Sequence, residues 1–122
     1  MVILADTSIW IDYFRKSDPH VEALSRQGQM CGHPFVSGEL AAGSQQLHHR
    51  MLLVIRELPQ LSPVKEDQFY AFIEANAVNG KGVGFVDIHL LAAVSRSEDV
   101  FLWTKDRRLF EQADRLGLAY RP

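Results

Sequence analysis

Apolar residues fall along this chain in two patterns, short continuous runs and stretches with a helical period. The run at Val2–Ala5 is typical of a buried strand, and Val100–Trp103 is a second run of the same kind. Elsewhere, apolar residues recur every three or four positions, as they do on one face of a helix. This period, together with start and stop residues such as Pro19 and Gly28, predicts helices over residues 9–14, 19–26, 34–43, 44–58, 65–77, 86–95 and 107–116.

Three weaker segments complete the predicted order of elements. Residues 29–32, 61–64 and 118–120 are short strand candidates, and Pro63 would restrict the second of them to the edge of a sheet. Strands that alternate with helices predict a three-layer α/β/α fold with a mainly parallel central sheet. At 122 residues the chain is long enough for one hydrophobic core and too short for two. We therefore expect a single domain over residues 1–122.

The composition is ordinary for a soluble globular protein, with 47% hydrophobic and 23% charged residues. No apolar run approaches the roughly 18 residues of a membrane span, and Asp6 interrupts the first run. We therefore expect no signal peptide and no membrane association. The single cysteine, Cys31, excludes an internal disulfide and is expected in the core. It fits a reducing compartment, so a cytoplasmic location is expected.

Four acidic residues adjoin the apolar segments: Asp6, Glu39, Asp87 and Asp106. Each is expected at the carboxyl end of a strand or near the start of a helix, and a parallel sheet brings such positions together at one edge. A buried carboxylate needs a partner, and no lysine or arginine is an obvious one. Mg²⁺ prefers oxygen ligands such as these. The alternative for each acid alone is a helix cap, and for Asp87 alone the cap is favoured.

In their order along the chain, the motifs around these acids resemble those of the PIN domain, and within it the VapC-type toxins of bacterial toxin-antitoxin pairs. The matching stretches are Asp6-Thr7-Ser8 with the helix after it, Glu39-Leu40-Ala41-Ala42-Gly43, Asp87-Ile88-His89-Leu90-Leu91-Ala92-Ala93 and Thr104-Lys105-Asp106-Arg107-Arg108-Leu109-Phe110. The resemblance covers the whole chain, although residues 44–81 match only in their helical character. It implies a Mg²⁺-dependent endoribonuclease, with Mn²⁺ as a possible substitute. Such a protein would form a homodimer and be inhibited by a cognate antitoxin.

The resemblance also implies roles for the four acids. Asp6 and Asp87 would be direct metal ligands, and Glu39 and Asp106 would complete the catalytic site directly or through water molecules. The bound metal would activate water for attack on an RNA phosphodiester bond.

Two hydroxyl residues, Ser8 and Thr104, each stand two positions from one of these acids. A hydroxyl in such a place can orient a carboxylate that binds metal. For Thr104, a simple threonine at a strand end is an equally weighted alternative. Thr7 or Ser8 is also expected to cap the helix over residues 9–14.

The charge of the chain bears on whether it binds nucleic acid. A formal net charge of −2 argues against such binding, but only in part. If the four acids are set aside, 11 acidic residues remain against 13 lysines and arginines. Lys105, Arg107 and Arg108 flank Asp106 at a predicted helix start, where cations oppose the helix dipole. An approaching phosphate would relieve that conflict, so these three residues are predicted to contact RNA.

The helix over residues 9–14 is apolar on more than the one stripe that packing requires. We therefore predict that Trp10, Tyr13 and Phe14 contact another protein chain, and the resemblance implies that this chain is the antitoxin. Burial of the helix within the domain is an equally weighted alternative.

Two other functions compete with the ribonuclease. A receiver-like signalling domain also gathers acids at strand ends, but it needs an acidic pair after the first strand, and here Thr7 follows Asp6. It also needs an aspartate after the third strand, and the chain has none between Asp18 and Asp67. The other function is that of a catalytically inactive PIN fold, which would bind RNA or act as a scaffold. The presence of all four acids argues against it.

Overall fold

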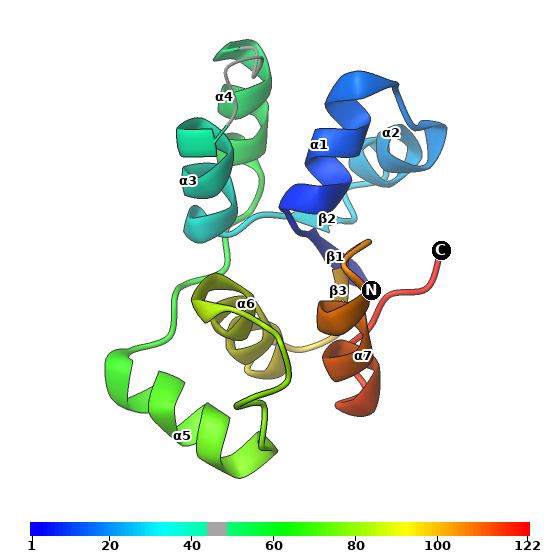
Figure 1. The fold of residues 1–122 in the computed structure, drawn as a ribbon. Coiled ribbons are helices and arrows are strands. Elements are labelled where there is room, and N and C mark those ends of the chain that lie inside the picture. Colours follow the sequence, from blue (N-terminus) through cyan, green and yellow to red (C-terminus); the bar gives the residue numbers. More distant parts are fainter. Residues whose placement is uncertain (44–48) are drawn as a thin grey trace.

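The structure, a computed structural model, describes residues 1–43 and 49–122 and contains a central sheet of three parallel strands (Figure 1). β1 (Val2–Ala5) lies between β2 (Met30–Cys31) and β3 (Val100–Trp103). β1 and β3 pair in parallel along their whole length. The two continuous apolar runs of the sequence thus form neighbouring strands, as expected for strands covered on both faces.

The described part of the chain contains seven helices. They are α1 (Thr7–Arg15), α2 (Pro19–Arg26), α3 (Pro34–Gly43), α4 (His49–Glu57), α5 (Glu66–Asn76), α6 (Phe85–Ser95) and α7 (Arg107–Arg115). Figure 1 shows α1 to α4 above the sheet and α5 to α7 below it. The predicted α/β fold with a parallel sheet is confirmed.

The predicted helices are present in the described residues, with ends that differ from the predictions by two residues at most. One prediction extends beyond those residues: of the helix expected over 44–58, the structure shows His49–Glu57, and 44–48 lie outside the described part.

Residues 61–64 were predicted to form a strand, and this prediction is wrong. The sheet is extended there by a single bridge between Gly32 and Gln60. The N–H of Gly32 donates to the carbonyl of Pro59 at 2.8 Å, and the N–H of Leu61 donates back to Gly32 at 2.8 Å. Pro63 has no N–H with which to continue the ladder.

The strand predicted over 118–120 is also reduced to one bridge, between Leu102 and Ala119. The N–H of Leu102 donates to Leu118, and the N–H of Tyr120 donates back to Leu102, both at 2.8 Å. The sheet therefore has one bridged segment beside each of its outer strands.

The larger hydrophobic cluster surrounds β1 and includes part of α6, and a smaller cluster contains Ile88 and Ala92 of the same helix. Ile3 and Leu4 are fully buried, and α6 adds Leu91 and Val94. Cys31 is a buried free cysteine, as predicted. None of the helices in the described residues is long and apolar enough to cross a membrane.

The pairing of β1 with β3 sets the position of the candidate site. Ala5 lies opposite Trp103, so the chain leaves these adjacent strands at the same edge of the sheet. The next residues are Asp6 and Thr104. The N–H of Asp6 donates to the carbonyl of Trp103 at 3.0 Å, which holds the two exits together.

Candidate active site

Asp6 is buried at the carboxyl end of β1, where it also caps α1. Its Oδ1 accepts hydrogen bonds from the backbone N–H of Ser8 at 2.9 Å and of Ile9 at 3.3 Å. The expectation that Thr7 or Ser8 caps this helix is therefore wrong. An aspartate directly before the first helical turn can accept hydrogen bonds from the free N–H groups there. Asp6 therefore takes the cap position, and Thr7 and Ser8 are already inside the helix.

Two hydroxyl groups hold the Asp6 carboxylate, one at each of its oxygens. The Ser8 hydroxyl donates to Oδ1, and the Thr104 hydroxyl donates to Oδ2. Each hydroxyl oxygen also accepts a backbone N–H, that of Lys105 for Ser8 at 2.9 Å and that of Asp106 for Thr104 at 3.0 Å. The network joins the ends of β1 and β3, so the orientation of Asp6 is fixed by both strands.

The other three acids lie on separate elements. Asp106 is exposed and caps α7, because its Oδ1 accepts from the N–H of Arg108 at 2.9 Å and of Leu109 at 3.1 Å. Asp87 is half-buried in the first turn of α6, and Glu39 is exposed on α3. The cap alternative therefore describes one function of Asp6 and Asp106, and it leaves their second carboxylate oxygens outside the backbone cap. Asp87 also contributes to the start of its helix, because its Oδ2 accepts from the N–H of Gly84, the N-cap residue of α6, at 3.4 Å.

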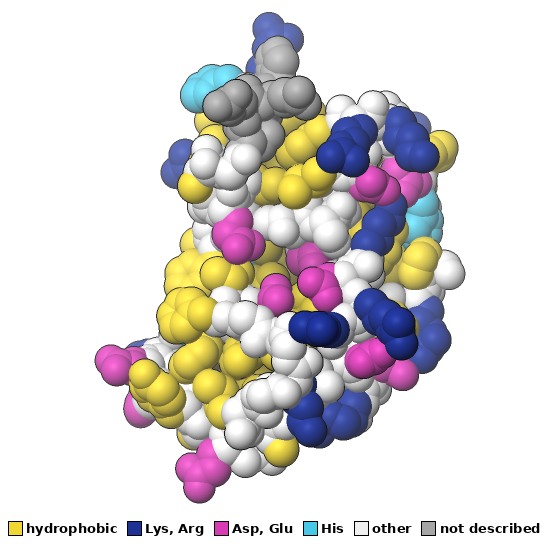
Figure 2. All heavy atoms as spheres, viewed as in Figure 1, with side chains coloured by type: hydrophobic (Ala, Val, Ile, Leu, Met, Phe, Trp, Pro, Cys, Tyr) yellow, Lys and Arg dark blue, Asp and Glu magenta, His cyan; other side chains and the backbone are white. Residues whose placement is uncertain are grey.

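The pKa values link the four acids electrostatically. Burial raises the pKa of Asp87, and the charges of Asp106 and Asp6 raise it further. Burial also raises the pKa of Glu39, with added repulsion from Asp87 and Asp6. Figure 2 shows acidic side chains gathered near the centre of one face of the molecule. The fold thus brings together four acids that are far apart in the sequence.

The ion pairs of the described residues leave these four acids without a basic partner. Lys105 pairs with Asp12, Arg107 with Glu111, and Arg121 with Asp114. Burial is also the main cause that raises the pKa of Asp6, against the hydrogen bonds that lower it. The cluster of carboxylates therefore carries negative charge that no ion pair among residues 1–43 and 49–122 neutralises.

The donor set fits a hard divalent cation, since every side-chain donor in it is a carboxylate oxygen. Within residues 1–43 and 49–122, no three acidic, histidine or cysteine side chains lie close enough to share one ion as they stand. Mg²⁺ does not require such a cage, because it usually keeps several waters and takes one or two carboxylates directly. Asp6 and Asp87, the two more buried acids of the four, would be the residues that hold it.

The raised pKa of Asp87 predicts how pH affects the stability of the metal-free protein. A carboxyl with a raised pKa in the folded state binds its proton more tightly there than in the unfolded state. Its contribution to stability is therefore present at low pH and is lost as pH rises from the ordinary value of 3.8 through the raised value. We expect Asp87→Asn to have a higher Tm than the wild type at pH 7 in EDTA.

This difference in Tm should shrink as pH is lowered toward 4, because the wild-type carboxyl then becomes neutral as well. Thermal unfolding followed by circular dichroism measures it. Glu74→Gln, which changes an exposed acid on α5, serves as the control and should show a smaller effect at pH 7. An Asp87→Asn protein that is less stable than the wild type at pH 7 would contradict the repulsion between the acids.

The predicted RNA-contacting residues, Lys105, Arg107 and Arg108, are exposed at the start of α7. Arg108 packs over Gly82, which has a φ of +81°, in the loop before α6. A Cβ on Gly82 would lie only 2.6 Å from Cδ of Arg108. This contact ties the basic helix start to the loop that leads to Asp87. Sequence reasoning missed it, because nothing local to either residue indicates the other.

The expectation of an exposed contact surface on α1 is wrong for Trp10. Its side chain is only 3% exposed and belongs to the hydrophobic core. Its ring meets that of Tyr13 edge to face, with centroids 6.1 Å apart. Tyr13 and Phe14 are half-buried and pack at the margin of the core. The helix is apolar on several sides because the domain itself covers more than one of them.

A groove of about 470 Å³ nevertheless lies beside α1. It runs between α1, α2 and α4, and most of its surface is apolar. The residues that line it are Trp10, Tyr13, Val21, Glu22, Ser25, Arg26, Met51, Val54 and Leu58. Only the edge of Trp10 can reach this groove, since the side chain is almost entirely buried.

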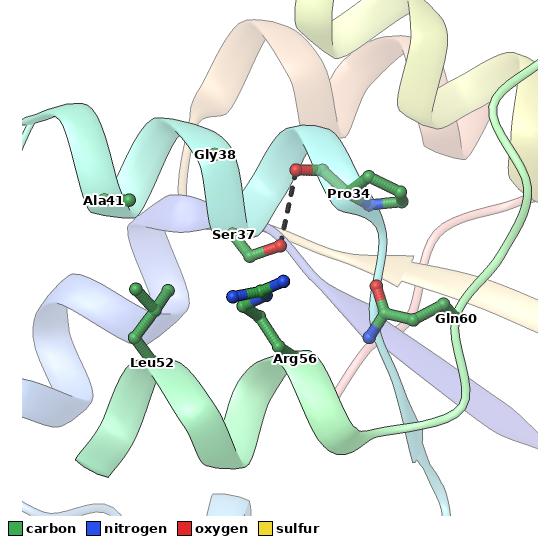
Figure 3. A pocket seen from close by; sticks show the side chains of 7 residues that line it. All are labelled: Pro34, Ser37, Gly38, Ala41, Leu52, Arg56 and Gln60. Atoms are coloured by element: carbon green, nitrogen blue, oxygen red, sulfur yellow. Dashed lines mark hydrogen bonds between the residues drawn. The ribbon is translucent and has the colours of Figure 1, made fainter. Parts of the chain in front are cut away.

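A second cavity, of about 440 Å³, lies between α3 and α4 (Figure 3). It is lined by Pro34, Ser37, Gly38, Ala41, Leu52, Arg56 and Gln60. In Figure 3 the guanidinium of Arg56 extends from α4 toward Ser37, whose hydroxyl donates to the carbonyl of Pro34 at 3.3 Å. None of the described residues that line this cavity is acidic, so it is not a cation site. The four carboxylates remain the candidate active site.

Comparison with known proteins agrees with the fold. The model of the PIN domain family matches residues 3–116. The chain is 33% identical over 118 residues to Ribonuclease VapC32 of Mycobacterium tuberculosis, from both the CDC 1551 / Oshkosh strain and the ATCC 25618 / H37Rv strain. These alignments cover 97% of this chain and 95% of each relative. A match to the family model over nearly the whole sequence shows that this chain belongs to the PIN domain family.

Proposed function

We propose that this chain is a single-domain, metal-dependent endoribonuclease that acts as the toxin of a toxin-antitoxin pair. The observation that carries the proposal is the cluster of Asp6, Glu39, Asp87 and Asp106. Burial and the charges of Asp106 and Asp6 raise the pKa of Asp87, and burial and the charges of Asp87 and Asp6 raise the pKa of Glu39. No ion pair of the described residues includes any of the four acids. The relatives named as ribonucleases support RNA as the substrate. Mg²⁺ is the proposed cofactor, with Mn²⁺ as a possible substitute.

The four acids and the two hydroxyl residues would have different roles in hydrolysis. Asp6 and Asp87 would hold the cation, with Asp6 kept in place by the hydroxyls of Ser8 and Thr104. Glu39 and Asp106 would complete the site directly or through water. A bound divalent cation supplies an acidified water and neutralises negative charge on the phosphate. Because that water is already acidic, a histidine base is not required.

Cleavage of a labelled single-stranded RNA by the purified protein tests the proposed function. We expect cleavage with Mg²⁺ or Mn²⁺ and none in EDTA, with activity restored when excess metal is added back. Cleavage that continues unchanged in EDTA would rule out the metal mechanism. Tight RNA binding without cleavage under all these conditions would instead favour an inactive PIN fold that binds RNA.

Arg107 and Arg108 are proposed to contact RNA phosphates, together with Lys105. The double variant Arg107→Gln with Arg108→Gln is expected to bind RNA more weakly. The slope of log K against log salt concentration should fall by about 0.7 for each lost phosphate contact. Fluorescence anisotropy over a series of salt concentrations measures both quantities.

The control for the arginines is Arg96→Gln, which removes an exposed cation at the other end of α6. It should keep the affinity and salt slope of the wild type. If the double variant also keeps both, the two arginines do not contact the substrate.

The groove between α1, α2 and α4 is the proposed binding site for the antitoxin. Its apolar walls suit an apolar segment of a partner, and Tyr13 and Met51 offer surface that is only half-buried.

We also propose that the protein acts in the cytoplasm as a homodimer. Sedimentation of the protein alone and with its antitoxin would test the number of subunits.

A further inference from the structure

A cluster of rings from three helices, which we call the aromatic patch, lies beside the acids. It consists of Phe35 on α3, Phe69 and Tyr70 on α5, and Phe85 and His89 on α6. The ring of Phe69 stacks on that of His89, with centroids 4.2 Å apart and planes 20° apart. Phe85 meets the edge of His89 at 4.6 Å. The patch is thus a packed set of rings.

Two rings of this patch are largely open to solvent. Phe85 is 63% exposed and Tyr70 is 61% exposed, whereas Phe69 and His89 beneath them are buried. Together with Glu66, these four residues line a cavity of about 340 Å³, within the roughly 300–1,000 Å³ of small-molecule sites. Phe85 contributes little to the core, because the buried face of α6 begins at Ile88. Packing within the chain therefore does not explain the two exposed rings.

The aromatic patch adjoins the acidic site on two helices. Phe35 lies one turn before Glu39 on the same side of α3, and Phe85 lies two residues before Asp87 in the first turn of α6. Phe35 also contacts His89, with centroids 4.9 Å apart, so the rings connect the two helices that carry these acids. In Figure 2, hydrophobic surface lies to the left of the central acids, and lysines and arginines lie to the right.

Basic side chains, metal-binding acids and aromatic rings lie side by side on this face (Figure 2). A single-stranded nucleic acid could place its phosphates along the first two and its bases on the rings. Phosphates that face the basic side and the metal-binding acids would leave the bases free to turn toward the rings. Aromatic side chains stack on any base, and such stacking requires bases that are not paired in a duplex.

We propose that the aromatic patch is a stacking site for one unpaired nucleobase of the RNA, next to the bond that is cut. The inference rests on the proposed function and narrows it, since the substrate must offer an unstacked base beside the scissile phosphate. Phe85 is the residue most exposed for this contact, with Tyr70 beside it.

The test uses Phe85→Ser and Phe85→Trp, both in a protein that also carries Asp87→Asn so that the RNA is not cut. The probe is a labelled single-stranded RNA of mixed sequence. We expect Phe85→Ser to weaken binding about tenfold, the usual effect of losing one stacked ring. The salt slope should not change, because stacking releases no counterions. Leu53→Ser, which removes an exposed apolar side chain from α4, should bind RNA as tightly as the parent.

The tryptophan variant supplies a direct signal of stacking. Phe85→Trp should retain the affinity of the parent, and the fluorescence of its new indole should be quenched when the RNA binds. The native tryptophans, Trp10 and Trp103, are buried and serve as background measured in the parent. An indole signal that RNA leaves unchanged, or Phe85→Ser binding at parental affinity, would overturn the proposal.

A contact between two copies of the chain is the competing use of the patch. In that case Phe85→Ser and Tyr70→Ser would sediment as smaller particles than the parent and would bind RNA with unchanged affinity, which would also overturn the proposal. The proposed function is tested separately by cleavage with Asp87 intact. If the wild type cuts RNA and Phe85→Ser binds RNA normally, only the proposed stacking site is wrong, and the proposed ribonuclease function stands.

Discussion

Replacement of Asp87 by alanine is expected to lower the rate of RNA cleavage by about a thousandfold or more, as when a group that acts as part of one catalytic unit is lost. Asp87 is half-buried beside Asp6 and Asp106, and it is one of the two residues proposed to hold the cation. The fold should survive, because the change removes a repelled charge. Among the described residues, the Asp87 carboxylate accepts a single, long hydrogen bond, from the N–H of Gly84 at 3.4 Å.

Initial rates of cleavage, with circular dichroism of the same samples, measure this effect. Asp6→Asn should be similarly inactive, since its carboxylate is the other proposed ligand. Glu74→Ala, which removes an exposed acid on α5 away from the cluster, should cut RNA at the wild-type rate. A folded Asp87→Ala protein with full activity, free of contaminating nuclease, would show that the acids are not the active site.

Trp10→Glu is expected to unfold the protein or to remove most of its stability. The indole is 3% exposed in the core, and truncation of a buried tryptophan alone costs about 3–5 kcal/mol. An unpaired carboxylate in its place adds a further cost. Since domains of this kind are stable by only about 5–15 kcal/mol, the sum approaches the whole free energy of unfolding.

Ile11→Glu is the matched control, because Ile11 is on the same helix and 41% exposed. It should change the free energy of unfolding by about 0.5 kcal/mol or less, as surface substitutions usually do. Urea unfolding of the two variants makes the comparison. A Trp10→Glu protein as stable as Ile11→Glu would mean that Trp10 faces solvent, as the apolar character of the helix first suggested.

The sequence alone predicts β1, β3 and the helices well, because each depends on residues that are close together in the chain. Continuous apolar runs mark the two strands, and Pro34 and Gly43 mark the two ends of α3. The segments at Gln60 and Ala119 were overestimated as strands. Their pairing depends on how far the neighbouring strand extends, which local composition does not reveal.

For the candidate site, the sequence indicates which acids the sheet edge brings together but not how they are held. That Asp6 would receive the Thr104 hydroxyl follows from the register of β1 on β3, which is a property of the sheet. The burial of Trp10 likewise depends on the elements packed around α1. The aromatic patch joins rings that are as far apart in the sequence as Phe35 and Phe85, so only the fold brings them together.

The most direct test of a cation site built by these acids is a titration with Mn²⁺ followed by electron paramagnetic resonance, in which free aqueous Mn²⁺ gives the signal. We predict that the wild type and Glu74→Ala remove Mn²⁺ from solution with the same affinity. Asp6→Asn and Asp87→Ala should lose most of that binding. Equal Mn²⁺ binding by all four proteins, or none by the wild type, would contradict a metal centre formed by the four acids.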